Sequence, residues 1–228
     1  MLFGSSEPQD TTVVGLIVSS LRRDISFGVL SPGSKLKIGD LRVRYGGSNH
    51  SIREALRILA SEGLVEAVAQ RGFRVASATE DDLRDITSVR EEVEAIGLSR
   101  SIERGDLAWE GRVVAANHAL DKVEERIARE PSDLNALEWD EAVRAFFATL
   151  VSACESPRLI EIQRKYFDQS RRIRLSALRE GRLDFEARSR RRRSLIDAVL
   201  SRNVRTACAA LTQDIEIELC GEHSPLDQ

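Results

Sequence analysis

Four polar residues near the start of one predicted helix have side chains that suit contacts with the edges of DNA bases. The first turn and a half of that helix contains Ser48, Asn49, His50 and Arg53. An amide pairs best with adenine N6 and N7, whereas a guanidinium pairs with guanine O6 and N7. Arg53 could instead contact a phosphate, and His50 could be a plain exposed side chain of the cap region. These residue types at the start of a helix indicate recognition of nucleic acid.

The stretch from residue 36 to residue 75 predicts the elements that would position these side chains. Gly46-Gly47 ends a first short helix, because paired glycines are a strong turn signal. Ser48 suits the N-cap of the second helix, and Gly63 suits the residue that closes it. The apolar residues of the second helix follow the spacing of one buried face: Ile52, Ala55, Leu56 and Leu59.

A basic hairpin is predicted directly after the second helix. Two short apolar runs, 64–65 and 73–75, flank a tip formed by Gln70, Arg71 and Gly72. Two helices joined by a tight turn and followed by such a hairpin form the geometry that places a helix in a DNA major groove. The tip residue Arg71 is then assigned to phosphates or the minor groove, as are Arg42 and Arg44 of the first helix. Gly72 lets the hairpin backbone approach the DNA closely.

The distribution of charge supports this interpretation over the alternative that these are the helices and hairpin of an ordinary core. Residues 11–78 contain ten Lys and Arg against five Asp and Glu, a net charge of +5. The whole chain has a net charge of −3. A basic segment within an acidic chain indicates a surface that faces phosphates.

The run PGSKLKIGDLRVRYGGSNHSIREALRILASEGLV, followed by QRGFRV, resembles the winged-helix domain of GntR-family bacterial transcription factors. The closest resemblance is to the FadR/FCD branch, whose C-terminal domain is all helical. Asn49 lies where that family usually has arginine, and His50-Ser51 replace a frequent Thr-Pro. The resemblance therefore implies that this helix binds an operator. The preferred operator sequence should differ from the family's common operator by at least one base pair.

Composition and the few cysteines predict a cytoplasmic protein. Of the 228 residues, 42% are apolar, which is enough for a buried core. No apolar run approaches the roughly 18 residues that a membrane span requires, and the N-terminus has no signal-peptide pattern. The three cysteines are far apart, without zinc-type spacing: Cys154, Cys208 and Cys220. Reduced thiols are the expected state, and redox sensing by Cys208 or Cys220 is the alternative.

The pattern predicts a mainly α protein with three parts. These are a disordered tail over 1–10, a winged helix-turn-helix domain over 11–78 and a helical domain over 79–222. Thr79 and Asp82 have the spacing of a capping box at the start of the helical domain. Breaks at Gly, Pro and Ser divide that domain into segments 81–104, 106–129, 133–154, 157–180, 184–201 and 203–220. Six such helices can form an antiparallel bundle, which resembles the FCD effector domain.

The resemblance also implies where an effector site would lie. Many FCD domains bind a divalent metal through an aspartate (or histidine) and three histidines, and the metal holds a carboxylate effector. The matching positions here are Val143, Phe147, Arg192 and Asp214. Because none is histidine, and valine, phenylalanine and arginine have no lone pair to offer a metal, we expect neither metal nor cofactor.

In place of the family's metal site, the hypothesis for this chain is a metal-free site that binds a small organic acid. Arg192 could bind a carboxylate or phosphate fork-to-fork, or could pair with Asp214 across the cavity. Arg90 lies in a VRE triplet that resembles a family position facing the pocket. The alternatives are that the effector has been lost, or that Arg90, Arg192 and the whole run 190–193 are solvated.

Catalytic motifs are lacking in the sequence, so an enzyme is not expected. The resemblance implies a homodimer, paired through the helical domains, that binds a pseudo-palindromic DNA operator as a repressor and responds to a small anionic metabolite. The two alternatives are a winged-helix module that docks onto protein, and an all-helical enzyme with a basic accessory domain.

Overall fold

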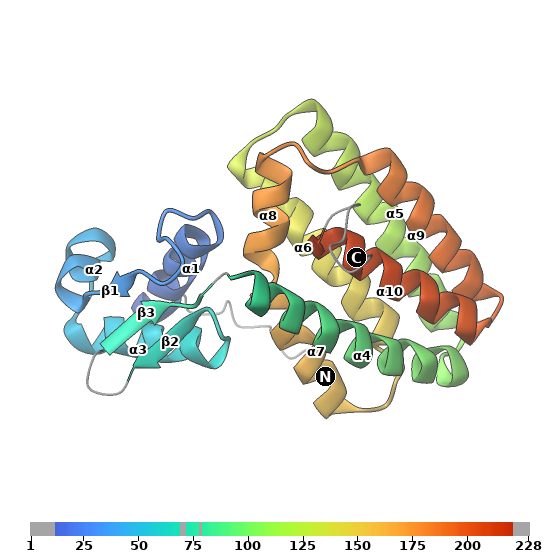
Figure 1. Ribbon diagram of the computed structural model, residues 1–228, viewed down its shortest axis with the longest axis horizontal. Coiled ribbons are helices and arrows are strands. Elements are labelled where there is room, and N and C mark those ends of the chain that lie inside the picture. The colour runs from blue at the N-terminus through green and yellow to red at the C-terminus, as the bar shows by residue number, and fades with distance from the viewer. Residues whose placement is uncertain (1–11, 69–71, 78, 221–228) are drawn as a thin grey trace, which may run out of the picture. The chain divides into compact units, whose positions relative to one another are not determined.

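The computed structural model describes residues 12–68, 72–77 and 79–220 (Figure 1). The chain divides into two compact units, Met1–Ser77 and Ala78–Gln228, named here the N-terminal unit and the helical unit. The tail expected over 1–10 and the hairpin tip at Arg71 lie outside the described residues. Every helix in the described ranges is too short or too polar to cross a lipid bilayer.

The N-terminal unit contains helices and a small antiparallel sheet. Its elements in chain order are α1 (Val13–Ser26), β1 (Lys35–Leu36), α2 (Ile38–Tyr45), α3 (Asn49–Ser61), β2 (Val65–Val68) and β3 (Gly72–Val75). The strand order is β1-β3-β2, with Val65 opposite Val75 and Lys35 opposite Arg74. The helix-turn-helix and hairpin are confirmed. Strand β1 was not expected, because a two-residue strand has no alternating pattern and pairs with residues far along the chain.

Local signals explain where α3 begins and ends. The N–H of Ser51 donates to Ser48 Oγ at 3.1 Å, so Ser48 is the N-cap, as predicted. Gly63 follows the helix with a φ of +78°, a conformation that glycine adopts without steric cost. The predicted apolar face is buried: Ile52, Ala55, Leu56 and Leu59 are all 0% exposed. They pack against apolar residues of α1, including Ile17 and Leu21.

The helical unit contains seven helices in its described residues. They are α4 (Glu80–Arg104), α5 (Leu107–Arg129), α6 (Asp133–Val151), α7 (Pro157–Gln169), α8 (Arg171–Arg179), α9 (Phe185–Leu200) and α10 (Val204–Cys220). Figure 1 shows α10 lying beside α4 and α9, and α5 beside α6. The predicted capping box is present, since Thr79 and Asp82 exchange side-chain and backbone hydrogen bonds.

The expectation of six helices is wrong at one position. The segment 157–180 divides at Ser170 into α7 and α8. The buried Ser170 hydroxyl donates to the carbonyl of Phe167 at 2.8 Å and accepts from Arg174 at 2.6 Å and from Arg90 at 3.2 Å. These buried hydrogen bonds join three parts of the chain at the break. Phe167 and Arg174 are local partners of Ser170, whereas Arg90 lies 80 residues away in the sequence, and no Gly or Pro marks the break.

The described cysteines do not favour redox sensing. Cys154 is buried, and Cys208 is half-buried with its thiol near the carbonyl of Ala95. Burial raises the pKa of the Cys208 thiol, which lowers the fraction of reactive thiolate.

Candidate nucleic-acid interface and helical-unit cavity

The N-terminal end of α3 is open to solvent. Ser48, Asn49, His50 and Arg53 are all exposed, while the opposite face of the same helix is fully buried. The backbone N–H groups of this first turn give the helix end a partial positive charge. A helix of this kind, anchored by its apolar face with a polar end projecting outward, has the geometry that enters a major groove.

Helix α2 is held to α1 by a buried carboxylate. Asp24 is 6% exposed, and its Oδ2 accepts from Arg44 Nη2 at 2.7 Å and from the Tyr45 hydroxyl at 2.7 Å. Burial, followed by the hydrogen bond to Asp24, raises the pKa of Tyr45, so Tyr45 stays protonated and donates. The role of Asp24 was not predicted from the sequence, although an acidic residue in helical phase with Ile17 and Leu21 on an apolar face was a signal.

Asp24→Ala should lower the free energy of unfolding of the N-terminal unit by about 1–3 kcal/mol, because it removes the acceptor of the Tyr45 hydroxyl and of Arg44. Urea unfolding followed by circular dichroism measures this change. Asp40→Ala, at an exposed position of α2, is the matched control and should change stability by no more than about 0.5 kcal/mol. Equal effects of the two variants would contradict a structural role for Asp24.

The other residues that the sequence assigns to DNA contacts differ in their exposure and in their partners within the chain. Arg42 is exposed and donates to Asn49 Oδ1 at 3.4 Å, so the two side chains lie together. Arg44 is half-exposed and forms an ion pair with Asp24. Gly72 is exposed at the start of β3 with a φ of +91°, and nothing lies within 4 Å of the position of a Cβ atom there. This leaves room for a close approach of the backbone to a partner.

The helical unit encloses a network of buried ion pairs. Arg90 is 1% exposed, and it donates to Glu94 Oε1 at 2.7 Å and to Glu218 Oε1 at 3.2 Å. Its guanidinium also lies over the rings of Phe147 and Phe167. The alternative that Arg90 is a solvated residue is therefore wrong. Burial by itself raises the pKa of Glu218, but the attractions of the neighbouring arginines outweigh it and the pKa lies below its ordinary value.

Arg192 is also buried, and it points toward α5. Its Nη1 and Nη2 donate to Glu124 at 3.0 and 2.6 Å, Nη2 donates to Asp121 at 2.5 Å, and Nε donates to Asn117 at 3.2 Å. The solvated alternative is wrong for Arg192 as well, although Arg190 and Arg193 are exposed. Because each nitrogen of Arg192 already donates to α5, this guanidinium does not present an open fork to an anion.

The alternative that Arg192 pairs with Asp214 is wrong. The partner of Asp214 is Arg191, whose Nε donates to Asp214 Oδ1 at 3.0 Å. Successive residues of a helix project about 100° apart, so neighbouring arginines of α9 reach different helices. Arg191 faces α10, and Arg192 faces α5.

The four residues that the resemblance places at the family's metal positions are not arranged to hold a metal. Val143 and Phe147 are buried, and Phe147 packs against the rings of Phe146 and Phe167. Arg192 and Asp214 are engaged in the ion pairs described above. Within the described ranges, no group of three or more His, Cys, Asp or Glu side chains is arranged to hold a metal ion. Aromatic packing and arginine–carboxylate pairs take the place of metal ligands.

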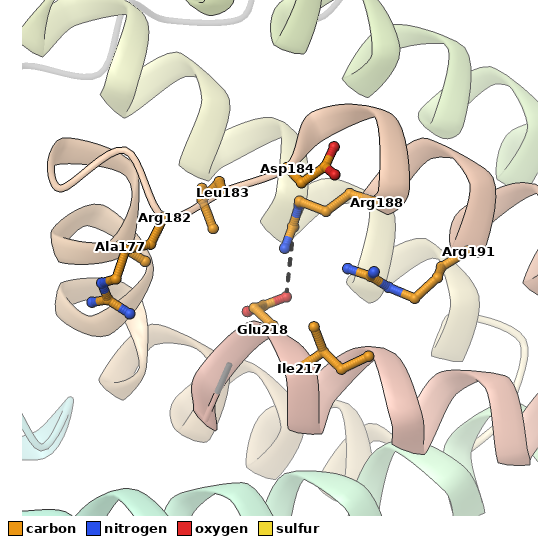
Figure 2. A pocket seen from close by; sticks show the side chains of 8 residues that line it. All are labelled: Ala177, Arg182, Leu183, Asp184, Arg188, Arg191, Ile217 and Glu218. Carbon is orange, nitrogen blue, oxygen red and sulfur yellow. Dashed lines mark ion pairs between the residues drawn. The ribbon is translucent and has the colours of Figure 1, made fainter. Parts of the chain in front are cut away.

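A cavity of about 310 Å³ lies between the end of α8, α9 and α10. Its polar lining residues are Arg182, Asp184, Arg188, Arg191 and Glu218. Figure 2 shows Arg188 and Arg191, both on α9, pointing toward Glu218 on α10. Arg188 and Glu218 were not predicted from the sequence. The available signal was helical phase, since Arg188 precedes Arg192 by one turn and Glu218 follows Asp214 by one turn.

These features define a class of protein: a winged-helix DNA-binding unit joined in one chain to an all-helical unit that has a cavity among its helices. The model for bacterial regulatory proteins of the gntR family matches residues 15–75, and the FCD domain model matches residues 85–216. The chain therefore belongs to the GntR family, in the branch with an FCD domain. Members of this family are DNA-binding transcription regulators and not enzymes, and this chain is such a regulator.

Individual relatives agree with this assignment. The chain is 35% identical to the HTH-type transcriptional repressor GlaR of Escherichia coli over 198 residues, 86% of this chain and 89% of GlaR. It is 41% identical to the HTH-type transcriptional regulator BphR of Paraburkholderia xenovorans over 161 residues, 69% of this chain but only 64% of BphR.

The solved structure of a GntR-type transcriptional regulator from Rhodococcus sp. RHA1 is also similar to this chain. It aligns with a TM-score of 0.67 and 26% identity, covering 92% of this chain and 98% of that one. The McbR/YncC protein of Escherichia coli aligns with a TM-score of 0.69 and 18% identity, covering 90% and 94% of the two chains, and shows the shared fold.

Proposed function

We propose that the chain is a homodimeric repressor that binds a pseudo-palindromic operator in the bacterial cytoplasm and releases it when a small organic acid enters the helical unit. The exposed polar end of α3 carries this proposal, because Asn49, His50 and Arg53 stand outside a helix whose other face is buried. A two-fold dimer presents two such helices to successive major grooves, which requires two related half-sites. Repression agrees with the name of the GlaR relative.

The direct test is to select bound sequences from a random DNA pool with the full chain. The expected result is enrichment of two inverted half-sites whose centres are about 10 base pairs, or a multiple of that, apart. A second step titrates the selected operator at several salt concentrations and screens small acids for release. Recovery of no common sequence would overturn the operator proposal. A single half-site would overturn the dimeric mode of binding.

Asn49→Arg should change the preferred base at one position of each half-site from adenine to guanine. The amide of Asn49 matches adenine N6 and N7, whereas arginine matches guanine O6 and N7. The expected discrimination is about 1–3 kcal/mol, or roughly 5- to 150-fold between the two operators. Fluorescence anisotropy with both operators measures this ratio for each protein.

The matched control is Arg57→Lys, which changes an exposed residue at the other end of α3 and should leave the base preference unaltered. If Asn49→Arg kept the original preference while still binding DNA, Asn49 would not contact a base.

A further inference from the structure

The glycine turn between α2 and α3 brings an arginine of α2 to the polar end of α3. Gly46 and Gly47 both have a positive φ, +76° and +80°. A Cβ atom at position 47 would lie 2.9 Å from Cδ1 of Ile17, so a side chain there would push the turn away from α1. With this turn, Arg42 in the last turn of α2 lies beside Asn49 in the first turn of α3. Its Nη1 donates to Asn49 Oδ1 at 3.4 Å.

This contact fixes the orientation of the Asn49 amide. A guanidinium only donates hydrogen bonds, so Arg42 selects the amide oxygen and leaves the Nδ2 group facing away. Both side chains are exposed, and a surface contact of this kind contributes little to stability. Its consequence is that the amide has one orientation before any DNA is bound.

The orientation of an amide matters because adenine and guanine differ at one position in the major groove. Adenine has the N6 donor where guanine has the O6 acceptor, and both have N7 beside it. An amide whose oxygen faces that position accepts from adenine N6 and repels guanine O6. The reversed amide donates to guanine O6 instead. An amide held in one orientation therefore discriminates between the two purines better than one that rotates freely.

The neighbouring polar groups at this end of α3 have other partners or other directions. Ser48 Oγ accepts from the Ser51 N–H at 3.1 Å and is hydrogen-bonded to Ser51 Oγ at 3.0 Å, so the cap occupies these two hydroxyls. His50 projects about 100° away from Asn49 around the helix. Arg53 follows Asn49 by one turn, on the same exposed face. Asn49 is therefore the amide of the first turn whose orientation a neighbour controls.

We propose that Arg42 is a specificity-determining residue of the DNA interface. It holds the Asn49 amide in the orientation that accepts from adenine N6, so that each half-site requires adenine rather than guanine at that base pair. Arg42 acts through Asn49 and is a positioning residue. This role differs from a phosphate contact, which strengthens binding to every sequence alike. The inference rests on the proposed operator binding by α3 and extends the reading surface to α2.

The test compares two operators that differ only in adenine or guanine at the base pair read by Asn49. That base pair is the one at which Asn49→Ala loses its preference when the selected operator is varied position by position. Fluorescence anisotropy with the full chain measures the Kd of each operator, and the ratio of the two values is the readout.

Arg42→Met should reduce the preference for adenine about two- to tenfold, a factor equivalent to the cost of ordering one side chain on binding. Binding to adenine must then order the amide, while the reversed orientation becomes available to guanine. Arg42→Lys keeps a charged donor for the same oxygen and should retain most of the preference. In a chain that already has Asn49→Ala, Arg42→Met should leave the ratio unchanged, because no amide remains to be oriented.

Lys37→Met is the matched control, because Lys37 is an exposed cation at the start of the same helix. It should weaken both operators alike and leave their ratio unchanged. A second readout needs no DNA. The side-chain amide resonances of Asn49 in the nuclear magnetic resonance spectrum of the free chain should shift in Arg42→Met and stay in place in Lys37→Met.

Three results would overturn the proposal while leaving operator binding intact. The first is that Arg42→Met weakens both operators by the same factor, as the loss of a phosphate contact would. The second is that Arg42→Met changes the ratio equally with and without Asn49→Ala, which would mean that Arg42 reads the base itself. The third is that Asn49→Ala loses its preference at no base pair. Failure of the unaltered chain to select any common sequence would instead overturn the operator proposal and this inference together.

Discussion

Arg53→Ala should abolish sequence-specific DNA binding while leaving the winged-helix fold intact. Arg53 is exposed on the N-terminal half of α3, one residue after the buried Ile52 that anchors the helix. A bidentate contact between arginine and guanine is worth about 1–3 kcal/mol in each half-site, or roughly 5- to 150-fold, and the proposed dimer would lose it twice. Titration of the selected operator and of random DNA, by fluorescence anisotropy, measures both the lost affinity and the lost specificity.

Arg57→Ala provides the matched control for this prediction. Arg57 is an exposed arginine on the same helix, one turn further from its N-terminus, where it pairs with Glu54 at 3.1 Å. Its removal should lower binding to all sequences slightly and leave the ratio of operator to random DNA unchanged. Circular dichroism should show the same melting temperature for both variants. Normal operator binding by Arg53→Ala would mean that α3 is not the helix that reads the bases.

The second large effect is expected from Arg90→Ala, which should destabilise the helical unit by about 3–5 kcal/mol. The side chains of Glu94 and Glu218 are 1% exposed, and both lose a buried counter-charge in this variant. Removal of one partner from a buried pair is costly because the remaining charge is neither solvated nor paired. The rings of Phe147 and Phe167 also lose the guanidinium that covers them. Urea unfolding measures the change.

The pH dependence gives this prediction a second readout. Burial already raises the pKa of Glu94 in the native protein, and removing Arg90 should raise it further. A carboxyl whose folded pKa lies above its unfolded value of about 4.3 binds more protons in the folded state, so stability falls as the pH rises between the two values. The loss in free energy of unfolding caused by Arg90→Ala should therefore become smaller as the pH is lowered toward the pKa that Glu94 has in the unfolded chain. A deficit that is independent of pH would contradict an electrostatic cause.

Arg100→Ala is the control for both measurements, because Arg100 is exposed on the same helix. It should change stability by no more than about 0.5 kcal/mol at any pH in this range. If the two variants unfolded at the same urea concentration, the buried network around Arg90 would contribute nothing to the stability of the helical unit.

Elements that depend only on neighbouring residues could be predicted without a structure. Ser48 could be predicted as the N-cap of α3 because a cap needs only the backbone N–H groups of the next turn. Gly63 could be predicted as the residue that ends α3 because glycine tolerates a positive φ. Helical spacing in the chain identified the buried face of α3 and most of the helical unit. The sequence also led to the prediction that no metal is bound, because valine, phenylalanine and arginine at positions 143, 147 and 192 have no lone pair to offer a metal.

Tertiary structure alone decided which charged groups meet. Arg191 and Arg192 are adjacent and chemically identical, yet one pairs with α10 and the other with α5. The hydrogen bond from Arg90 to Ser170 and the ion pairs of Arg188 with Glu124 and Glu218 likewise form where segments distant in sequence converge. Caps and apolar periodicity are properties of a single segment, whereas the partner of a buried charge depends on the angles and distances at which several helices pack. That is the physical reason why the helix-turn-helix could be predicted from the sequence and the cavity could not.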